Sequence, residues 1–176
     1  MNLIINSFYL DNLVLSRNQF KLDNITEVFL PYISLTNKDI SNINILPNLY
    51  NLNLKSTGIT DEDVLSLYNL AKLETLDLSW NQLNILSMIM INNLKNLKYL
   101  NLSYNTLLDD DCIQSISNLQ NLLYLNLSFC KSLTSKSIKY IIKLKNLNQL
   151  ELSLCNFTIQ DIGYLRNNLK NCKIII

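Results

Sequence analysis

The chain has 176 residues, of which 48% are hydrophobic, enough for a sizeable core in one domain. Its 15 basic and 14 acidic residues leave a net charge of +1 without a basic stripe, which argues against nucleic acid or an anionic membrane surface as partner. It contains no histidine and no apolar run of about 18 residues, which argues against a Ser-His or Cys-His active site and against a membrane-spanning helix.

Residues 1–22 differ from the rest of the chain. The segment LDNLVLSRN, from Leu10 to Asn18, matches the repeat motif described below, but only 15 residues separate Leu10 from Ile25. That length is too short for a strand, a helix and two bends, so we expect an N-terminal cap, a hairpin or an irregular first repeat over 1–22. The start lacks basic residues and its apolar run is broken at Asn6, unlike a secretory signal peptide. We therefore expect a cytoplasmic, reducing location.

From Asp23 onward the sequence repeats one frame. KNLKYLNLSYN at 95–105 recurs as QNLLYLNLSFC at 120–130, and the shared pattern is L-x-x-L-x-L followed three residues later by Asn, Cys or a substitute. Six copies begin at Ile25, Leu49, Leu73, Leu97, Leu122 and Leu147, at spacings of 24, 24, 24, 25 and 25 residues, and a partial copy begins at Cys172. Such a period indicates a solenoid. We number the positions of the frame from its first apolar residue.

Positions 1, 4 and 6 are apolar, which predicts a short strand with one buried face, and helical patterns between the strands predict a parallel sheet. Three helix starts carry capping boxes, Thr36 with Asp39, Thr60 with Asp63 and Thr158 with Asp161, and the acidic run 109–111 marks a fourth start. The segment NILSMIMIN, from Asn84 to Asn92, has no clear cap. Here we expect an irregular turn, or Met88 and Met90 facing an apolar partner.

Position 9 reads Ile33, Thr57, Asn81, Asn105, Cys130 and Cys155. Asparagine there is expected to bond to exposed backbone groups where the chain bends from strand towards helix, with cysteine as a compact substitute. Cys112 aligns with buried helix positions and Cys172 with position 1, so we expect all four cysteines to be buried small hydrophobes. No C-x-x-C pair is present, which argues against a zinc site.

This motif resembles that of the leucine-rich repeat family, L-x-x-L-x-L-x-x-N/C-x-L. The resemblance implies an α/β solenoid, or horseshoe, with a parallel sheet on the concave face and helices on the convex face. It covers residues 23–176, as six repeats and a partial C-terminal strand. The change from Asn to Cys at position 9, with LT and TD pairs after the bend, resembles the cysteine-containing, ribonuclease-inhibitor-like branch. The family is a binding scaffold whose partners vary, so the fold alone names no partner.

The variable positions 3, 5 and 8 are expected to line the concave face or its rim. The partner-binding residues expected there are Trp80, Tyr99, Tyr104, Tyr124, Phe129, Asp77, Asn101, Asn126 and Glu151. At position 8 two roles stay open for the aromatic residues, binding a partner or stacking on each other. Tyr99 and Tyr124 lie mid-strand, which favours binding.

The sequence thus predicts a non-catalytic protein–protein interaction module without cofactor or metal. One alternative is a substrate-recognition or decoy component of a ubiquitin ligase that lacks its own F-box. Another is self-association through the edge strand at 174–176, although a shielded edge and a monomer are favoured. The 28 asparagines and the scarcity of Gly, Pro, Arg and Ala indicate an AT-rich genome, from a large DNA virus, a protist or a low-GC bacterium. A viral or bacterial origin would make the partner a host protein, and a viral protein would act in the host cytoplasm. We interpret the asparagine excess as genome bias.

Overall fold

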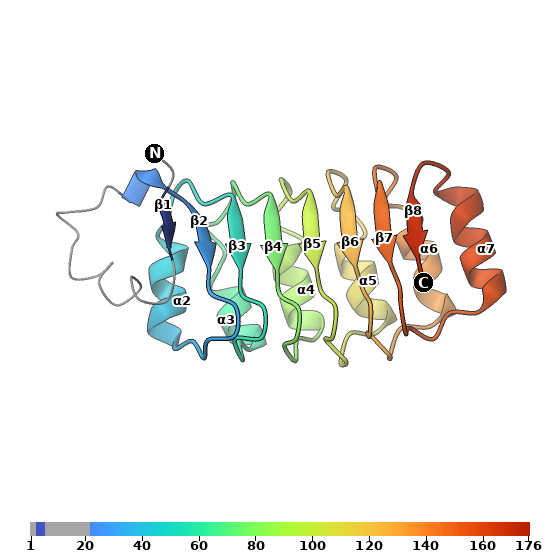
Figure 1. The fold of residues 1–176 in the computed structure, drawn as a ribbon, viewed down its shortest axis with the longest axis horizontal. Coiled ribbons are helices and arrows are strands. Elements are labelled where there is room, and N and C mark those ends of the chain that lie inside the picture. The colour runs from blue at the N-terminus through green and yellow to red at the C-terminus, as the bar shows by residue number, and fades with distance from the viewer. Residues whose placement is uncertain (1–2, 6–21) are drawn as a thin grey trace.

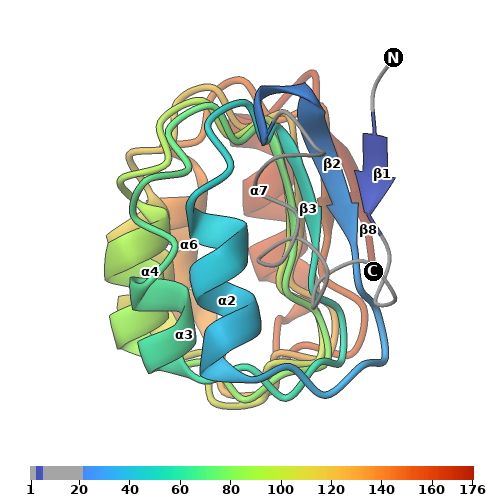
Figure 2. The ribbon, with the colours of Figure 1, turned by 90° about the vertical axis from the view of Figure 1, so that its left-hand side faces the viewer.

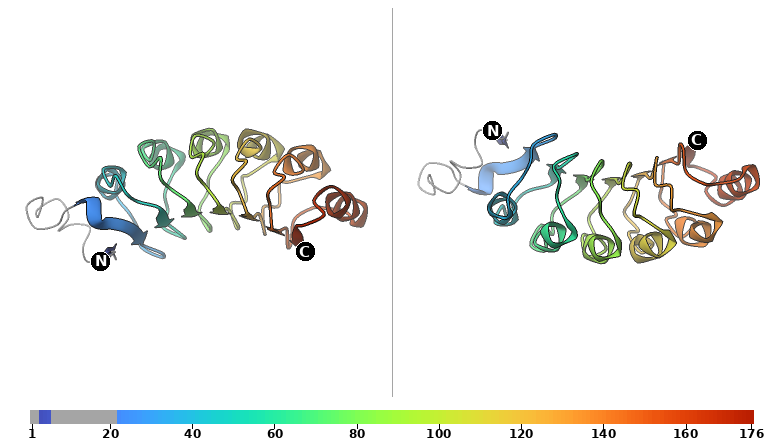
Figure 3. Two further views of the ribbon diagram at one scale, coloured as in Figure 1. Left: turned by 90° about the horizontal axis from the view of Figure 1, so that it is seen from above. Right: turned by 90° about the horizontal axis from the view of Figure 1, so that it is seen from below.

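The computed structural model describes residues 3–5 and 22–176. Their strands form one parallel sheet in chain order, so each repeat lies beside the next (Figure 1). The strands are β1 (Leu3–Ile5), β2 (Ile25–Phe29), β3 (Asn51–Asn53), β4 (Thr75–Asp77), β5 (Tyr99–Asn101), β6 (Tyr124–Asn126), β7 (Gln149–Glu151) and β8 (Lys173–Ile175). The helices cover one face of the sheet only (Figure 2), and the other face lines the inner side of a shallow arc (Figure 3). The expected solenoid is confirmed.

The alternation of buried and open side chains follows from the apolar pattern of the frame. In β3 to β7 the central residue of each strand, at position 4, is buried and its two neighbours are partly exposed. Positions 1 and 6 are buried as well, and the leucines of successive repeats pack into one continuous core. Positions 3 and 5 therefore share the open face of the sheet, as expected.

The helical layer consists of short elements. They are η1 (Leu22–Asn24), α2 (Asn37–Asn44), α3 (Asp61–Leu65), α4 (Ile85–Ile91), α5 (Asp110–Ile116), η2 (Ser135–Ser137), α6 (Ile138–Ile141) and α7 (Ile159–Asn168). Six of them, α2, α3, α4, α5, η2 and α7, have a side chain that caps the start. The three expected capping boxes, at Thr36, Thr60 and Thr158, are present. Asp109 caps α5, where its carboxylate accepts two backbone N–H groups at 3.1 Å each.

The expectation for Asn84–Asn92 was wrong. This segment contains a regular helix, α4, and Asn84 is its N-cap, with Oδ1 accepting the N–H of Leu86 at 2.9 Å. Met88 and Met90 are buried in the core instead of facing a partner. Asparagine caps a helix without the capping-box partner that the sequence search required.

Carboxylates also link helix starts between repeats. Asp61, in the first turn of α3, accepts the N–H of Asn84 at 2.9 Å and the hydroxyl of Ser87 in α4. Asp110 accepts the N–H and the hydroxyl of Thr134, at 2.9 and 2.6 Å. Each carboxylate thereby satisfies donors at the start of the next helical segment, and the helical layer is held in register with the sheet.

The change in repeat length from 24 to 25 residues lies between position 9 and the helix cap. The cap Asn84 comes three positions after Asn81, whereas the cap Asp109 comes four positions after Asn105. The strand register is unaffected, because Tyr99 still pairs with Tyr124 and Asn101 with Asn126. The extra residue is therefore absorbed in the loop that leads to the helices.

Position 9 has the role that the sequence predicts. The amide of Asn105 donates to the carbonyls of Leu78 and Leu102, both at 3.0 Å, and its Oδ1 accepts the N–H of Leu83 at 3.1 Å. Cys130 replaces it in the next repeat, where its thiol contacts the carbonyl of Leu102 at 3.4 Å. The side chains at position 9 of successive repeats thus form a hydrogen-bonded ladder. This ladder satisfies backbone groups that would otherwise be buried without partners.

A second asparagine ladder, missed by the sequence analysis, runs along the loops that enter the strands. Each of these amides donates to a carbonyl of the preceding repeat. The pairs are Asn48 with Asp23 (2.8 Å), Asn96 with Ala71 (2.8 Å), Asn121 with Lys95 (2.9 Å) and Asn146 with Gln120 (2.7 Å). Part of the asparagine excess therefore has a structural role, and genome bias alone does not account for it.

Two of the four cysteines depart from the expected burial. Cys112 and Cys130 are buried, but Cys155 and Cys172 are only partly buried, because they belong to the last turn of the solenoid. Burial raises the pKa of the Cys130 thiol to about 12 and that of Cys172 to about 11. Cys172 packs against the core as position 1 should, yet Leu150 pairs with Ile174, one residue earlier than the sequence alignment predicts.

Of the first 21 residues, the structure describes only 3–5, so most of what the sequence predicts for this segment is not tested. β1 pairs with β2 in parallel and extends the sheet by one strand. The motif match from Leu10 to Asn18 lies outside the described residues. The division into an N-terminal cap over 1–22 and a repeat domain over 23–176 stays a prediction.

We predict that Asn105→Ala lowers the free energy of unfolding by about 3 kcal/mol, because several buried backbone groups lose their partner. Asn105→Cys, which copies the residue at position 9 of the next repeat, should lose about half as much. Urea unfolding followed by circular dichroism measures both. Equal losses in the two variants would show that hydrogen bonding by this side chain is not what stabilises the bend.

Candidate functional site

The expected binding residues at positions 3 and 5 lie together on the open face of β4 to β7. The register places Tyr99 beside Tyr124. It also aligns the position 5 residues of four successive strands, in the order Asp77, Asn101, Asn126 and Glu151. The strands thus bring one aromatic pair and one polar row side by side at the centre of the sheet.

Tyr99 and Tyr124 form a parallel stack. Their ring centroids are 4.1 Å apart and the ring planes differ by 1°. Burial is the main cause that raises the pKa of both hydroxyls above the ordinary tyrosine value. The Tyr124 hydroxyl donates to Glu151 Oε1 at 3.0 Å, which also favours its protonated form. The pair is therefore fixed in place before any partner arrives, and a rigid aromatic surface loses little entropy on binding.

The polar row is hydrogen-bonded as two pairs. Asn101 donates to Asp77 Oδ2 at 3.0 Å, and Asn126 donates to Glu151 Oε2 at 2.8 Å. Gln149 and Ser79 supply further donors, to Glu151 Oε1 at 2.7 Å and to Asp77 Oδ1 at 2.6 Å. With the Tyr124 hydroxyl, five side chains donate to the two carboxylates, and all five are uncharged. Among the described residues, neither carboxylate is in an ion pair with lysine or arginine.

The aromatic residues at position 8 form a second stack. Trp80 and Tyr104 have ring centroids 3.7 Å apart, and Tyr104 and Phe129 have centroids 3.9 Å apart. Stacking, one of the two roles left open by the sequence, is thus confirmed, whereas partner binding by these residues stays a prediction. Trp80 is nevertheless half exposed and lines a cavity of about 530 Å³ together with Gly58 and Gln82.

Position 8 is a left-handed backbone position, which the sequence does not reveal. Trp80, Tyr104 and Phe129 have φ values of 60°, 60° and 63°, and Tyr32 and Leu154 share this conformation. Bulky side chains seldom adopt it, at a cost of roughly 1–2 kcal/mol per residue. Ring stacking between neighbouring repeats offsets part of that cost.

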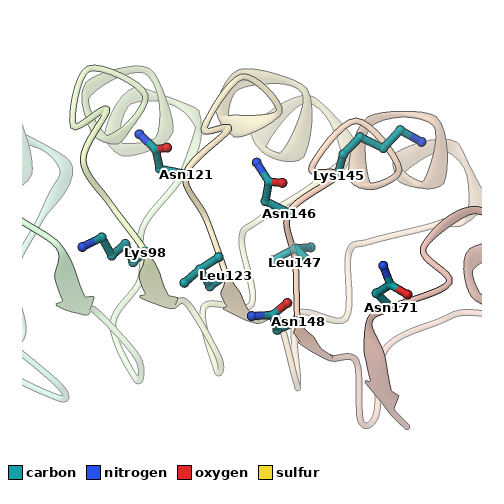
Figure 4. A pocket seen from close by; sticks show the side chains of 8 residues that line it. All are labelled: Lys98, Asn121, Leu123, Lys145, Asn146, Leu147, Asn148 and Asn171. Carbon is teal, nitrogen blue, oxygen red and sulfur yellow. The ribbon is translucent and has the colours of Figure 1, made fainter.

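A pocket that sequence analysis did not anticipate adjoins the tyrosine pair. It has a volume of about 370 Å³, and its lining residues come from the loops that enter β5 to β8 (Figure 4). They are Lys98, Asn121, Leu123, Lys145, Asn146, Leu147, Asn148 and Asn171. Lys98, Leu123 and Asn148 occupy position 2, directly before the position 3 row. The periodic lysines and asparagines were the available signal, but their convergence depends on the register.

Several hydrogen-bond donors that line this pocket already bond to other groups of the protein. Lys98 forms an ion pair with Glu74 at 2.8 Å, and Asn121 and Asn146 donate to backbone carbonyls in the second asparagine ladder. Leu123 is 40% exposed and offers an apolar contact beside Tyr124. Much of the polar lining of the pocket is therefore already bonded within the protein, and Leu123 is its exposed apolar part.

Within residues 3–5 and 22–176, no helix is long and apolar enough to cross a membrane. No group of three or more Cys, Asp or Glu side chains in this part of the chain is arranged to hold a metal ion. The acidic run at 109–111 serves instead as the start of α5.

Two family models with the description leucine rich repeat match residues 47–107 and 118–141. These segments are leucine-rich repeats, and the fold is that of a leucine-rich repeat solenoid. Proteins of this family are typically non-catalytic, and their repeat domains generally mediate protein–protein interaction.

Solved structures with the same fold include bacterial proteins. Internalin C2 from Listeria monocytogenes has a TM-score of 0.65 and 22% identity, over 88% of this chain and 71% of its own. A leucine-rich repeat protein of Leptospira interrogans has a TM-score of 0.58 and 25% identity, over 88% of this chain and 38% of its own. Among curated protein sequences, none matches this repeat protein significantly. The likeness to internalin C2 extends to the fold and carries no binding partner with it.

The left-handed backbone at position 8 predicts an unusual order of stability. Tyr104→Ala and Tyr104→Gly both lose the ring contacts with Trp80 and Phe129, but glycine adopts a positive φ without strain. Tyr104→Gly should therefore be about 1 kcal/mol more stable than Tyr104→Ala. Urea unfolding of the two variants tests this. A glycine variant no more stable than the alanine variant would contradict a strained backbone at this residue.

The raised pKa values of Tyr99 and Tyr124 predict a loss of stability in alkali. In the unfolded chain these tyrosines release their protons near pH 10, whereas the folded chain retains them to higher pH. Below pH 10 their protonation contributes no pH dependence, and above pH 10 the free energy of unfolding falls as pH rises. Tyr99→Phe/Tyr124→Phe should show a shallower fall in urea unfolding at successive pH values. The lysines and the buried thiols remain in both proteins, so parallel curves would contradict the assignment.

Proposed function

We propose that the protein binds another protein on its concave face, with the Tyr99–Tyr124 stack as the central anchor. The observation that carries this proposal is a rigid pair of aromatic rings in the middle of a solvent-facing sheet. Tyrosines held in this way are typical of binding hot spots, where one anchor contributes about 2 kcal/mol or more.

The surroundings of the pair support the proposal. Asp77, Asn101, Asn126 and Glu151 provide a polar border, and the pocket at Leu123 provides a depression beside the rings. Trp80, Tyr104 and Phe129 add a second aromatic surface at the opposite ends of the strands. An apolar centre with a polar border is the common anatomy of a protein interface.

Two finer assignments are also proposals. We place the protein in the cysteine-containing branch of the family, supported by the thiols of Cys130 and Cys155, which contact carbonyls at 3.4 and 3.0 Å where asparagine does so in other repeats. We place it in the cytoplasm on the strength of its four free cysteines. A host protein as partner rests on base composition alone.

Self-association is a second candidate, favoured by the C-terminal end of the solenoid. β8 is an edge strand in the described sheet, and Ile176 is 65% exposed beside a cavity of about 280 Å³ that Leu154, Phe157 and Ile159 help to line. Apolar edges of this kind can pair with another chain. Light scattering at high concentration tests it. A role in a ubiquitin ligase stays a prediction from the sequence, and co-purification with a cullin adaptor tests it.

The variant Tyr99→Ala/Tyr124→Ala should lose a partner that the unchanged protein captures from lysate of the source or host cell. Loss of two anchors of about 2 kcal/mol each lowers affinity by roughly a thousandfold, enough to abolish capture. Mass spectrometry of the captured proteins measures the difference.

The matched control is Tyr68→Ala/Tyr164→Ala, which removes two exposed tyrosines from the helical layer. All three proteins must first show similar thermal unfolding. If the concave variant captures the same proteins as the control, these tyrosines are not the anchors, and the proposal fails.

A further inference from the structure

The position 3 row gives Tyr99, which is partly exposed, a stacked ring on one side and only a threonine on the other. The register aligns Asn51, Thr75, Tyr99 and Tyr124 on adjacent strands. Since Tyr99 and Tyr124 stack in parallel, the other face of Tyr99 is turned towards Thr75. Threonine has the shortest side chain of this row and does not reach across that ring. An open aromatic face therefore borders a gap in the row.

A carboxylate lies next to this gap. Asp77 is two residues beyond Thr75 on the same strand, so both side chains project from the same face of the sheet, roughly 7 Å apart along the strand. Its oxygens accept from Ser79 and Asn101, which are neutral donors. Neutral hydrogen bonds stabilise a carboxylate but leave its negative charge uncompensated.

The wider sheet is negative around the tyrosine pair. Glu151 closes the polar row on the other side, and the charges of Asp77 and Glu151 add to burial in raising the pKa of Tyr99. The lysines nearby are engaged or peripheral. Lys98 pairs with Glu74, and Lys173 belongs to the edge strand. The Lys55 ammonium lies 5.2 Å from the Tyr32 ring centroid, where it feels the charge of Asp77 but forms no ion pair with it.

From this arrangement we propose that the concave face takes a basic polypeptide segment, with one arginine stacked on the open face of Tyr99 above Thr75 and paired with Asp77. The inference rests on the proposed function and names the chemistry of its partner. A guanidinium group is planar, stacks on aromatic rings and donates to a carboxylate, so it satisfies both features at once. Asp77 Oδ1 already accepts the N–H and the hydroxyl of Ser79, whereas Oδ2 accepts only from Asn101 and can take a further donor. A lysine ammonium matches only the charge.

The probe is the peptide acetyl-Gly-Gly-Arg-Gly-Gly-amide, titrated into the isotopically labelled full chain and followed by NMR at the Tyr99 ring and the Thr75 methyl group. The comparison peptide carries citrulline, which keeps the shape of arginine and lacks its charge, and a third carries phenylalanine. The arginine peptide should shift both signals and bind about tenfold more tightly than the citrulline peptide. Raising the salt concentration from about 0.05 to 0.5 M should weaken it several-fold.

Asp77→Asn should weaken the arginine peptide by about fivefold and leave the citrulline peptide unchanged. The substitution is mild for the fold, because Asn53, Asn101 and Asn126 occupy the same position, where each accepts the N–H of the residue two further on. Glu62→Gln, which removes one exposed charge from α3 on the convex side, is the control and should leave binding unchanged.

Equal affinity for arginine and citrulline, preference for phenylalanine, or shifts confined to the helical layer would overturn the inference. These outcomes are distinguishable from failure of the proposed function. If the tyrosine variant loses its partner while Asp77→Asn keeps it at every salt concentration, the concave face binds a partner that is not basic. If the tyrosine variant keeps its partner, the proposed function fails whatever the peptides do.

Discussion

The whole architecture depends on satisfying backbone groups at the bend where each strand leaves the sheet. One repeat cannot do this alone, because the amide of Asn105 bonds to carbonyls of its own repeat and of the preceding one. Asn81 does the same one repeat earlier, with carbonyls of Leu54 and Leu78. The stacking of repeats is therefore required both by their apolar faces and by their hydrogen bonds. The second asparagine ladder, at the other ends of the strands, imposes the same dependence.

This bend also determines where the aromatic surface lies. The residue before each ladder residue is forced into the left-handed region, so Trp80, Tyr104 and Phe129 leave the backbone in the same direction in successive repeats. Their stacking follows from that shared geometry and the spacing of adjacent strands. Tyr99 and Tyr124 stack for a simpler reason, since they are direct neighbours in a parallel register. Backbone geometry thus produces two aromatic surfaces, one of which carries strain.

Much of the fold was predictable because periodicity encodes it directly. The L-x-x-L-x-L spacing determines which side chains are buried, and the Thr–Asp pairs mark helix starts. The features that the sequence analysis missed depend on contacts between repeats. Asn84 was overlooked as a cap because its support comes from Asp61, 23 residues earlier. The second asparagine ladder was hidden by a composition that looked like genome bias. The shift at Ile174 reflects a short last repeat that hydrophobic alignment did not detect.

The sequence predicted which residues belong to the candidate site better than it predicted the contacts among them. The sequence placed Tyr99, Tyr124 and the row from Asp77 to Glu151 on one face, because residues two apart on a strand share a face. It did not reveal that the asparagines hold both carboxylates through neutral bonds, or that Thr75 leaves one tyrosine face open. Those features depend on which side chain lies across from which, and a single sequence gives no measure of that pairing.

The loop of variable length between position 9 and the helix cap has an evolutionary consequence. Since an added residue there leaves the strand register intact, length changes on the outer side do not disturb the spacing of side chains on the inner side. Whole repeats are then interchangeable units, and duplication or loss of one moves every later surface residue by one strand spacing, about 4.8 Å. The recognition surface can change in discrete steps while each local environment stays the same.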